Sequence, residues 1–155
     1  MIADSQNVKP ILAINGVHRC GRLPKISVVT VCRNSAKTIK KAIESINSQT
    51  YPNVEHIFID GASSDDTCDV ISAEVAKPYK LISEPDQGIY DALNKGISLA
   101  SGDVIGILHA DDFLQDSSVL ADIASLFQDP NTDAVFGDLE YVDRSDIDCV
   151  VRRWK

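Results

Sequence analysis

From Ile26 onward the chain alternates short apolar runs with segments of helical periodicity, and this alternation limits the fold more than any other feature. Runs typical of buried strands cover 26–31, 54–60, 79–83, 104–108 and 133–137. Between them, apolar residues recur at the spacing of a helix face in segments that begin near 35, 67, 89 and 119. Ser101 and Gly102 are expected to cap the third of these helices. Strands that alternate with helices form βαβ units, so the chain is predicted to be an α/β protein with an open, mostly parallel sheet and helices on both faces.

The length of 155 residues fits one domain, and 44% apolar with 25% charged residues is typical of a globular protein. Residues 25–155 are expected to form this domain. Residues 1–24 show no sustained period and are expected to form a poorly ordered extension; alternatively, the first strand begins earlier than Ile26. The apolar run at 11–14 is too short for a signal sequence or a membrane span.

Charge and cysteine content exclude several classes of function. The net charge of −8 argues against duplex nucleic acid as a partner, because phosphate binding needs a basic face. The four cysteines form no C-x-x-C pair, so neither a zinc site nor a thioredoxin-like motif is indicated. They are expected to be free thiols in a reducing compartment, which points to the cytoplasm.

Polar residues follow three of the predicted strands at the point where each strand ends. They lie at 32–34, 60–66 and 109–112. In open α/β sheets, ligands bind outside the carboxyl ends of the strands, where the strand order reverses. If the first four strands have the order 3-2-1-4, these loops border one crevice. That crevice would hold the four side chains most able to bind a ligand: Asn34, Asp60, Asp111 and Asp112.

The adjacent carboxylates of Asp111 and Asp112 indicate a site for Mg²⁺ or Mn²⁺, because two ionised acids side by side favour a cation. The alternative is that Asp112 caps the next helix. Asp60 has two interpretations as well, a turn-closing residue and an acceptor for a nucleotide N–H or hydroxyl. His109 is more readily explained as a packing residue than as a metal ligand, and Lys95 as a solvated lysine than as a phosphate ligand. Neither a G-x-G-x-x-G nor a P-loop motif occurs.

Several motifs, taken together, resemble a known family. They are Lys25–Asn34, Ser48–Asn53, Ile59–Thr67, Ser83–Gly96, and Ser101-Gly102-Asp103 followed by Asp111-Asp112. In order and spacing they are similar to the amino-terminal half of the family 2 glycosyltransferases with the GT-A fold. The match covers about residues 24–143, and it looks most like the branch that builds bacterial cell-surface polysaccharides.

The resemblance implies an enzyme that transfers a sugar, with inversion, from a nucleotide-diphospho-sugar to a glycan or lipid-linked acceptor. It implies Mg²⁺ or Mn²⁺ as cofactor. Asp112 matches the last acid of the metal-binding D-x-D triplet, and Asp111 a ligand of metal or ribose. Asp60 matches the first residue of the nucleobase pocket, and Val31 and Asn34 lie in the first nucleotide-binding loop. Peripheral association with the inner face of the membrane and a homodimer are further expectations.

The chain departs from the family pattern in four places. Arg33 stands where Tyr is usual, Ala110 opens the D-x-D triplet, and Gly61 replaces the second Asp of many relatives. The catalytic base of the family lies in the carboxyl-terminal half and is expected beyond Lys155. The alternative function is therefore a nucleotide-sugar-binding fragment without turnover. A receiver domain is disfavoured, because its acid pair follows the first strand, where this chain has residues 32–34.

Overall fold

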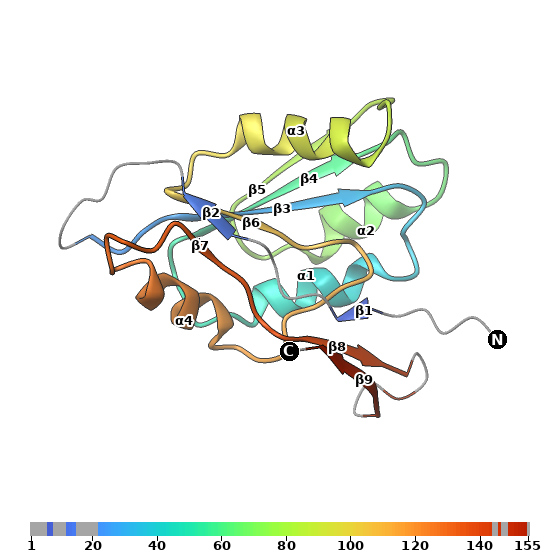
Figure 1. Ribbon diagram of the computed structural model, residues 1–155. Helices are drawn as coiled ribbons and strands as arrows, with labels where there is room; N and C mark the ends of the chain where they lie inside the picture. The colour runs from blue at the N-terminus through green and yellow to red at the C-terminus, as the bar shows by residue number, and fades with distance from the viewer. Residues whose placement is uncertain (1–5, 8–11, 15–21, 144–145, 147–148, 155) are drawn as a thin grey trace.

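A six-stranded sheet forms the centre of the molecule and carries helices on both faces (Figure 1). The computed structural model describes residues 6–7, 12–14, 22–143, 146 and 149–154. The strands are β1 (Gln6–Asn7), β2 (Leu12–Ile14), β3 (Ile26–Cys32), β4 (Val54–Asp60), β5 (Tyr79–Ser83), β6 (Val104–Ile107), β7 (Ala134–Val135), β8 (Leu139–Val142) and β9 (Val150–Trp154). The helices are α1 (Ile39–Asn47), α2 (Thr67–Glu74), α3 (Ile89–Leu99) and α4 (Val119–Leu126).

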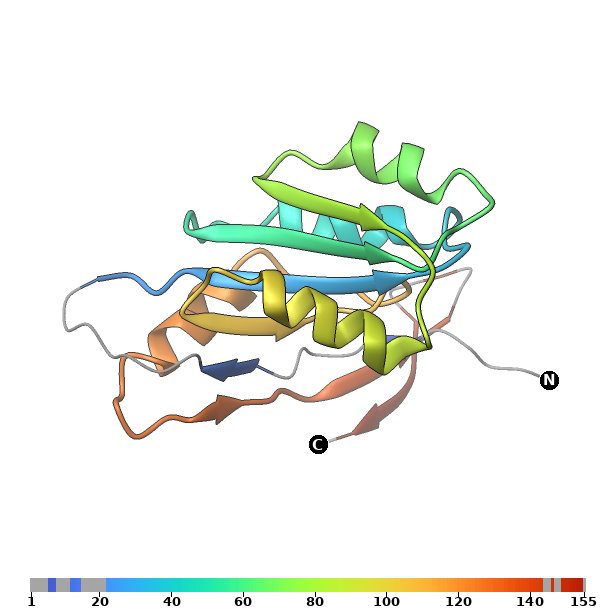
Figure 2. The same cartoon turned by 90° about the horizontal axis from the view of Figure 1, so that it is seen from above.

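The large sheet has the order β5-β4-β3-β6-β2-β7, which Figure 2 shows from above. The first four predicted strands are β3, β4, β5 and β6, so their order 3-2-1-4 is confirmed. These four strands are parallel. The pair β3–β4 runs in register from Ile26 opposite Val54 to Cys32 opposite Asp60. The strand order therefore reverses between β3 and β6, and the loops that follow both strands lie at the same edge.

Both faces of β3 and β4 are buried, which explains their continuous apolar runs. Val29 and Val31 face α3 and pack with Ile57, Ile59 and Ala92. Alternate residues of these strands face the opposite side of the sheet. There, α1 and α4 pack over Ile26 and Val28 in one cluster of buried residues. In another cluster, α1 and α2 pack over Phe58. The predicted arrangement with helices on both faces is confirmed (Figure 1).

Two short strands lie within the segment expected to be an extension. β2 pairs antiparallel with β6 and with β7, and β1 pairs antiparallel with β8 in a separate sheet of order β1-β8-β9. The first predicted strand, β3, begins at Ile26 as expected, and β2 is a separate strand that sequence analysis did not predict. The other residues of 1–21 lie outside the described part of the chain.

The expected cap of α3 is wrong. The helix ends at Leu99, and its C-cap is Ala100 in an extended conformation. Gly102 is instead needed for close packing at the amino ends of the strands. A Cβ atom on Gly102 would lie 2.7 Å from the carbonyl oxygen of Lys25 and 2.8 Å from the amide nitrogen of Ser27. Helix α1 also begins later than expected, because residues 36–38 form a turn in which Thr38 N and Ile39 N both donate to Ser35 O.

A polar network joins the amino ends of β3, β4 and β6. The buried carboxylate of Glu55 accepts hydrogen bonds from Ser27 Oγ at 2.6 Å, Lys25 Nζ at 2.9 Å and Ser101 N at 2.8 Å. Burial raises the pKa of Glu55, but these hydrogen bonds outweigh burial and lower the pKa to about 2. This network holds the edge of the sheet opposite to the predicted site.

No helix in the described part of the chain is long and apolar enough to span a membrane. The three described cysteines, Cys32, Cys68 and Cys149, are free thiols, as predicted.

Candidate functional site

Asp60 connects the loops that follow β3, β4 and β5. Its side chain is fully buried and accepts hydrogen bonds from Ser63 N at 2.9 Å, from Ser63 Oγ and from Ser83 Oγ at 2.6 Å. The thiol of Cys32 lies 3.7 Å from Asp60 Oδ1. Burial raises the pKa of Asp60, but the hydrogen bonds from Ser63 and Ser83 outweigh burial and lower it below its ordinary value. These contacts match the interpretation of Asp60 as a residue that closes the turn after its strand.

Asn34 extends this connection to the loop after β3. Its backbone has φ of 51°, a left-handed conformation that Asn tolerates better than most residues. The backbone amide of Asn34 donates a hydrogen bond to Ser63 Oγ at 2.8 Å, and the side-chain oxygen of Asn34 accepts one from Ser64 N at 2.9 Å. The loops after β3 and β4 are therefore tied together at two points.

The side chain of Val31 is part of the core. It is 8% exposed and packs in the cluster under α3. The backbone next to Val31 joins the end of β3 to the loop after β4, because Gly61 N donates a hydrogen bond to Cys32 O at 2.9 Å. Only the backbone around Val31 is therefore placed to meet a ligand at this edge.

The acid pair follows β6 directly. Leu108 N donates to Val29 O, so the chain leaves β6 beside β3, and Ala110 is buried in the same cluster as Cys32. Asp111 is exposed, whereas Asp112 is 1% exposed and its amide donates to His109 O at 3.1 Å. The alternative role of Asp112 as a helix cap is wrong, because the N-cap of α4 is Ser118.

The described residues contain no group of three His, Cys, Asp or Glu side chains arranged to hold a metal ion. Any ion at Asp111 and Asp112 would therefore need ligands from elsewhere. Ala110, the first residue of the triplet, already indicates this lack of protein ligands in the sequence, because an acid at that position would have supplied a third carboxylate.

Ser63, Ser83 and Asp86 belong to this edge and are absent from the predicted site. Ser63 and Ser83 were not distinguishable from other polar loop residues, because their contacts join loops distant in the sequence. Asp86 lies over Gly61: a Cβ atom on Gly61 would be 2.5 Å from Asp86 Oδ2. Its position within the motif Ser83–Gly96 was the signal that could have identified it.

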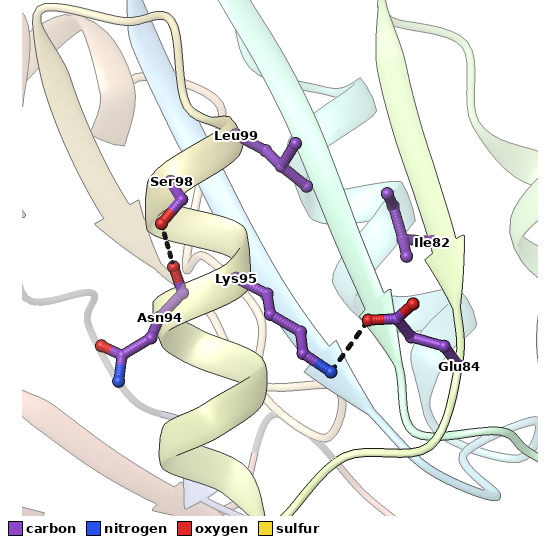
Figure 3. Close-up of a pocket in the computed structure, with 6 residues that line it drawn as sticks. All are labelled: Ile82, Glu84, Asn94, Lys95, Ser98 and Leu99. Carbon is purple, nitrogen blue, oxygen red and sulfur yellow. Dashed lines mark hydrogen bonds and ion pairs between the residues drawn. The ribbon is translucent and has the colours of Figure 1, made fainter.

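Lys95 is a partly exposed lysine of α3 whose ammonium group is engaged in ion pairs. Its ammonium group lies 2.9 Å from Glu84 Oε1 and 3.3 Å from Asp91 Oδ2. Figure 3 shows it reaching from α3 towards Glu84 across a pocket between α3 and β5. The pocket is lined by Ile82, Glu84, Asn94, Lys95, Ser98 and Leu99. Lys95 thereby ties the loop that carries Asp86 to α3.

Comparison with known proteins agrees with this fold. Residues 27–153 match the family profile described as glycosyl transferase family 2. The chain is 32% identical over 120 residues to a PGL/p-HBAD biosynthesis glycosyltransferase of Mycobacterium bovis BCG, covering 75% of this chain and 47% of that protein.

Two solved structures show the same fold. The mannosyltransferase PcManGT from Pyrobaculum calidifontis, in complex with GDP-Man and Mn²⁺, has 23% identity and a TM-score of 0.65 over 77% of this chain and 36% of that one. TarS 1–349 of S. aureus, in complex with UDP-GlcNAc, has 22% identity and a TM-score of 0.59 over 66% of this chain and 31% of that one. The chain thus spans less than half the length of each protein it matches here. With the profile match and the GT-A architecture together, the chain belongs to glycosyltransferase family 2.

Proposed function

We propose that this chain binds a nucleotide-diphospho-sugar and forms the donor-binding part of an inverting glycosyltransferase. The observation that carries the proposal is the edge where the loops after β3, β4 and β5 are hydrogen-bonded together, beside the acid pair that follows β6. Ligands of open α/β sheets bind at this edge. The two structural neighbours were solved with GDP-Man and with UDP-GlcNAc, which supports a donor of this class.

Asp111 and Asp112 would hold Mg²⁺ or Mn²⁺. Carboxylate oxygens are the protein ligands that both ions prefer, and Asp111 is exposed at the end of β6. With two acids in place of three, the diphosphate of the donor would supply further oxygens. A bound divalent ion would stabilise the negative charge that develops on the departing nucleoside diphosphate.

The residues of the first loops would shape the nucleotide pocket. We assign to Asn34 and to the backbone at Val31 a direct position beside the nucleotide, and to Asp60 a role in holding the pocket loops together. An inverting transfer also needs a general base against the acceptor hydroxyl. We assign that base to none of the described residues; the matched relatives are more than twice as long as the aligned segment.

The acceptor would be a glycan or a lipid-linked glycan of a bacterial surface. The mycobacterial relative is named a PGL/p-HBAD biosynthesis glycosyltransferase, and a biosynthetic role is in keeping with this proposal. A position in the cytoplasm or at the inner face of the membrane stays a prediction. So does a homodimer; β9 is one of the edge strands and exposes Val151 and Trp154.

Thermal unfolding with and without ligand tests the proposal. Mn²⁺ or Mg²⁺ together with a nucleoside diphosphate should raise the melting temperature, since a ligand at a hundredfold excess over its Kd stabilises the folded state by about 2.7 kcal/mol. Asp112→Asn should abolish the part of the shift that depends on the metal. Asp133→Asn, which changes an exposed aspartate just before β7, is the matched control and should leave the shift intact. If neither UDP nor GDP changes the melting temperature with either metal, the proposal is wrong.

A further inference from the structure

We propose that Cys32 and Cys68 form a redox-sensitive thiol pair, and that a low-molecular-weight disulfide oxidises them to a disulfide bond that weakens nucleotide binding. In this structure both residues are free thiols. Formation of the bond does not depend on the proposed function. Its effect on nucleotide binding does, because it assumes that a nucleotide binds at the edge where Asp60 joins the loops.

The thiol of Cys32 lies at the end of β3, beside the carboxylate of Asp60. Cys32 stands opposite Asp60 in the register of β3 and β4, and its sulfur is 3.7 Å from Asp60 Oδ1 and 3.8 Å from Ile59 O. The residue is 7% exposed and packs in the same buried cluster as Ile71 of α2. The side chain of Cys32 is therefore on the face of the sheet that α2 covers.

Cys68 reaches the same carboxylate from α2. It is the second residue of that helix and lies three positions before Ile71, so the two side chains share one helix face. Because Ile71 packs with Cys32, this face is turned towards the end of β3. The thiol of Cys68 has hydrogen-bond contacts with the side chains of Asp60 and Ser83. Two thiols from different elements thus meet at one buried carboxylate.

The two thiols differ in their access to solvent. Cys68 is partly exposed, whereas Cys32 is buried. Burial, followed by the negative charge of Asp60, raises the pKa of the Cys32 thiol, and burial also raises the pKa of Cys68. The thiolate is the form that attacks a disulfide, so oxidation is slow and the pair stays reduced in a reducing compartment. Cys68 is the thiol that an oxidant meets first.

Two thiol–disulfide exchange steps would form the bond. The thiolate of Cys68 attacks one sulfur of the oxidant, whose S–S bond breaks and releases a first small thiolate. The sulfur of Cys32 then loses its proton and attacks Cys68 Sγ, which releases a second small thiolate. The protons lost by the two cysteines end on the two released thiolates. The thiol pair is thereby oxidised, and one small disulfide is reduced to two thiols.

The bond would act on both loops that shape the candidate nucleotide edge. Cys32 directly precedes the loop after β3, and Cys68 follows the loop after β4 at the start of α2. In the reduced protein, Ser35 N of the first loop donates to Thr67 Oγ1 at 2.8 Å. A disulfide fixes the two Cβ atoms about 3.5–4.5 Å apart and removes both thiols as donors to Asp60. A buried carboxylate that loses donors is destabilised, so the loops would rearrange and bind nucleotide more weakly.

Mass spectrometry of the full chain treated with oxidised glutathione tests whether the bond forms. Cys20→Ala combined with Cys149→Ala leaves only the thiol pair, and this variant is the reference. Its intact mass should fall by two hydrogen atoms, and peptide mapping should find Cys32 joined to Cys68. In the same background, Cys32→Ala should stop at a mixed disulfide of Cys68 with glutathione. Cys68→Ala should form no bond within the chain.

Calorimetric titration with UDP or GDP in the presence of Mn²⁺ tests the effect on the edge. Oxidation of the reference variant should lower its affinity for the nucleotide about fivefold or more, and dithiothreitol should restore it. Cys68→Ala in the same background is the matched control and should keep its affinity after the same treatment. A mixed disulfide confined to Cys68 would overturn the inference, as would a bond within the thiol pair that leaves the affinity unchanged. If the reduced protein binds neither nucleotide, the proposed function is wrong, while the peptide map still decides whether the bond forms.

Discussion

The backbone amide of Asn34 donates a hydrogen bond to the hydroxyl oxygen of Ser63 at 2.8 Å, across 29 positions of the sequence. The same hydroxyl donates to the buried carboxylate of Asp60. One serine thus connects a left-handed residue after β3 with the acid at the end of β4. The shape of the candidate nucleotide edge depends on this connection, because neither loop has regular secondary structure to hold it.

Removing the Ser63 hydroxyl should loosen this edge. Ser63→Ala is expected to lower the free energy of unfolding by about 1–3 kcal/mol, because a buried carboxylate loses a donor and an amide loses its acceptor. Nucleotide affinity should fall with it, while the metal-dependent part of the thermal shift persists. Urea unfolding and calorimetric titration measure the two effects.

Ser64→Ala is the matched control for Ser63→Ala. The Ser64 hydroxyl is exposed and lies 3.3 Å from Asn34 Oδ1, and the stronger contact of Ser64 with Asn34 comes from its backbone amide. Its loss should cost no more than about 0.5 kcal/mol. Equal effects of the two substitutions would show that the Ser63 hydroxyl does not connect the loops.

Acid should destabilise the protein over two overlapping pH ranges, of which the upper one belongs to His56 and the lower one to Glu55. His56 is fully buried against Phe58, and burial lowers its pKa from 6.5 to about 3. Between these values the unfolded chain binds a proton that the folded chain does not, so the free energy of unfolding falls as the pH is lowered from 6.5 towards 3. The lowered pKa of Glu55 acts in the same direction, but only as the pH falls from 4.5 towards 2.

Urea unfolding at pH 7, 5.5 and 4.5 separates these contributions. His56 Nε2 is hydrogen-bonded to Thr30 Oγ1 at 2.8 Å, so both partners are replaced together in Thr30→Val with His56→Leu. This double variant should lose most of the pH dependence between 6.5 and 4.5. The Glu55→Gln variant should keep the pH dependence of stability between 6.5 and 4.5. Its free energy of unfolding at neutral pH should fall, because the hydrogen-bond network around the carboxylate is broken. A double variant with the unmodified pH profile would exclude His56 as the cause.

Gly96 and Gly102, two of the tightly packed glycines, should differ in their tolerance of alanine. A Cβ atom on Gly102 meets backbone atoms of Lys25 and Ser27, whereas on Gly96 it meets Val29 Cγ1 at 2.3 Å. Backbone cannot move aside as a side chain can, so Gly102→Ala should cost about 3 kcal/mol or more and Gly96→Ala about 1–3 kcal/mol. Val29→Ala should rescue part of the loss in Gly96→Ala, measured by urea unfolding. The expectation for Gly102 is wrong if its alanine variant is as stable as the unmodified chain.

The amino-acid pattern was sufficient to predict the four parallel strands β3, β4, β5 and β6 and their order in the sheet, but not the short strands β1, β2 and β8. The apolar runs of β3 and β4 are buried on both faces, and only a parallel sheet covered on two sides accommodates such runs. The strand order follows from right-handed crossovers and from the need to bring the polar loops to one edge. The pattern also identified the positions of Asn34, Asp60 and the acid pair at that edge, because Asp60 ends β4 and the others lie in the loops after β3 and β6.

The contacts of those residues depend on the tertiary structure and could not be predicted from the sequence pattern. Asp60 is a loop-holding residue because Ser63 and Ser83 reach it, and Ser83 comes from a different strand. Asp86 fills the space beside Gly61 because hydrogen bonds between residues far apart in the sequence hold its loop against the end of β4. Periodicity and motif spacing report on neighbours along the chain. Hydrogen bonds between loops depend on which strands lie side by side and on the few ångströms that separate their ends, and these are set only when the whole sheet has formed.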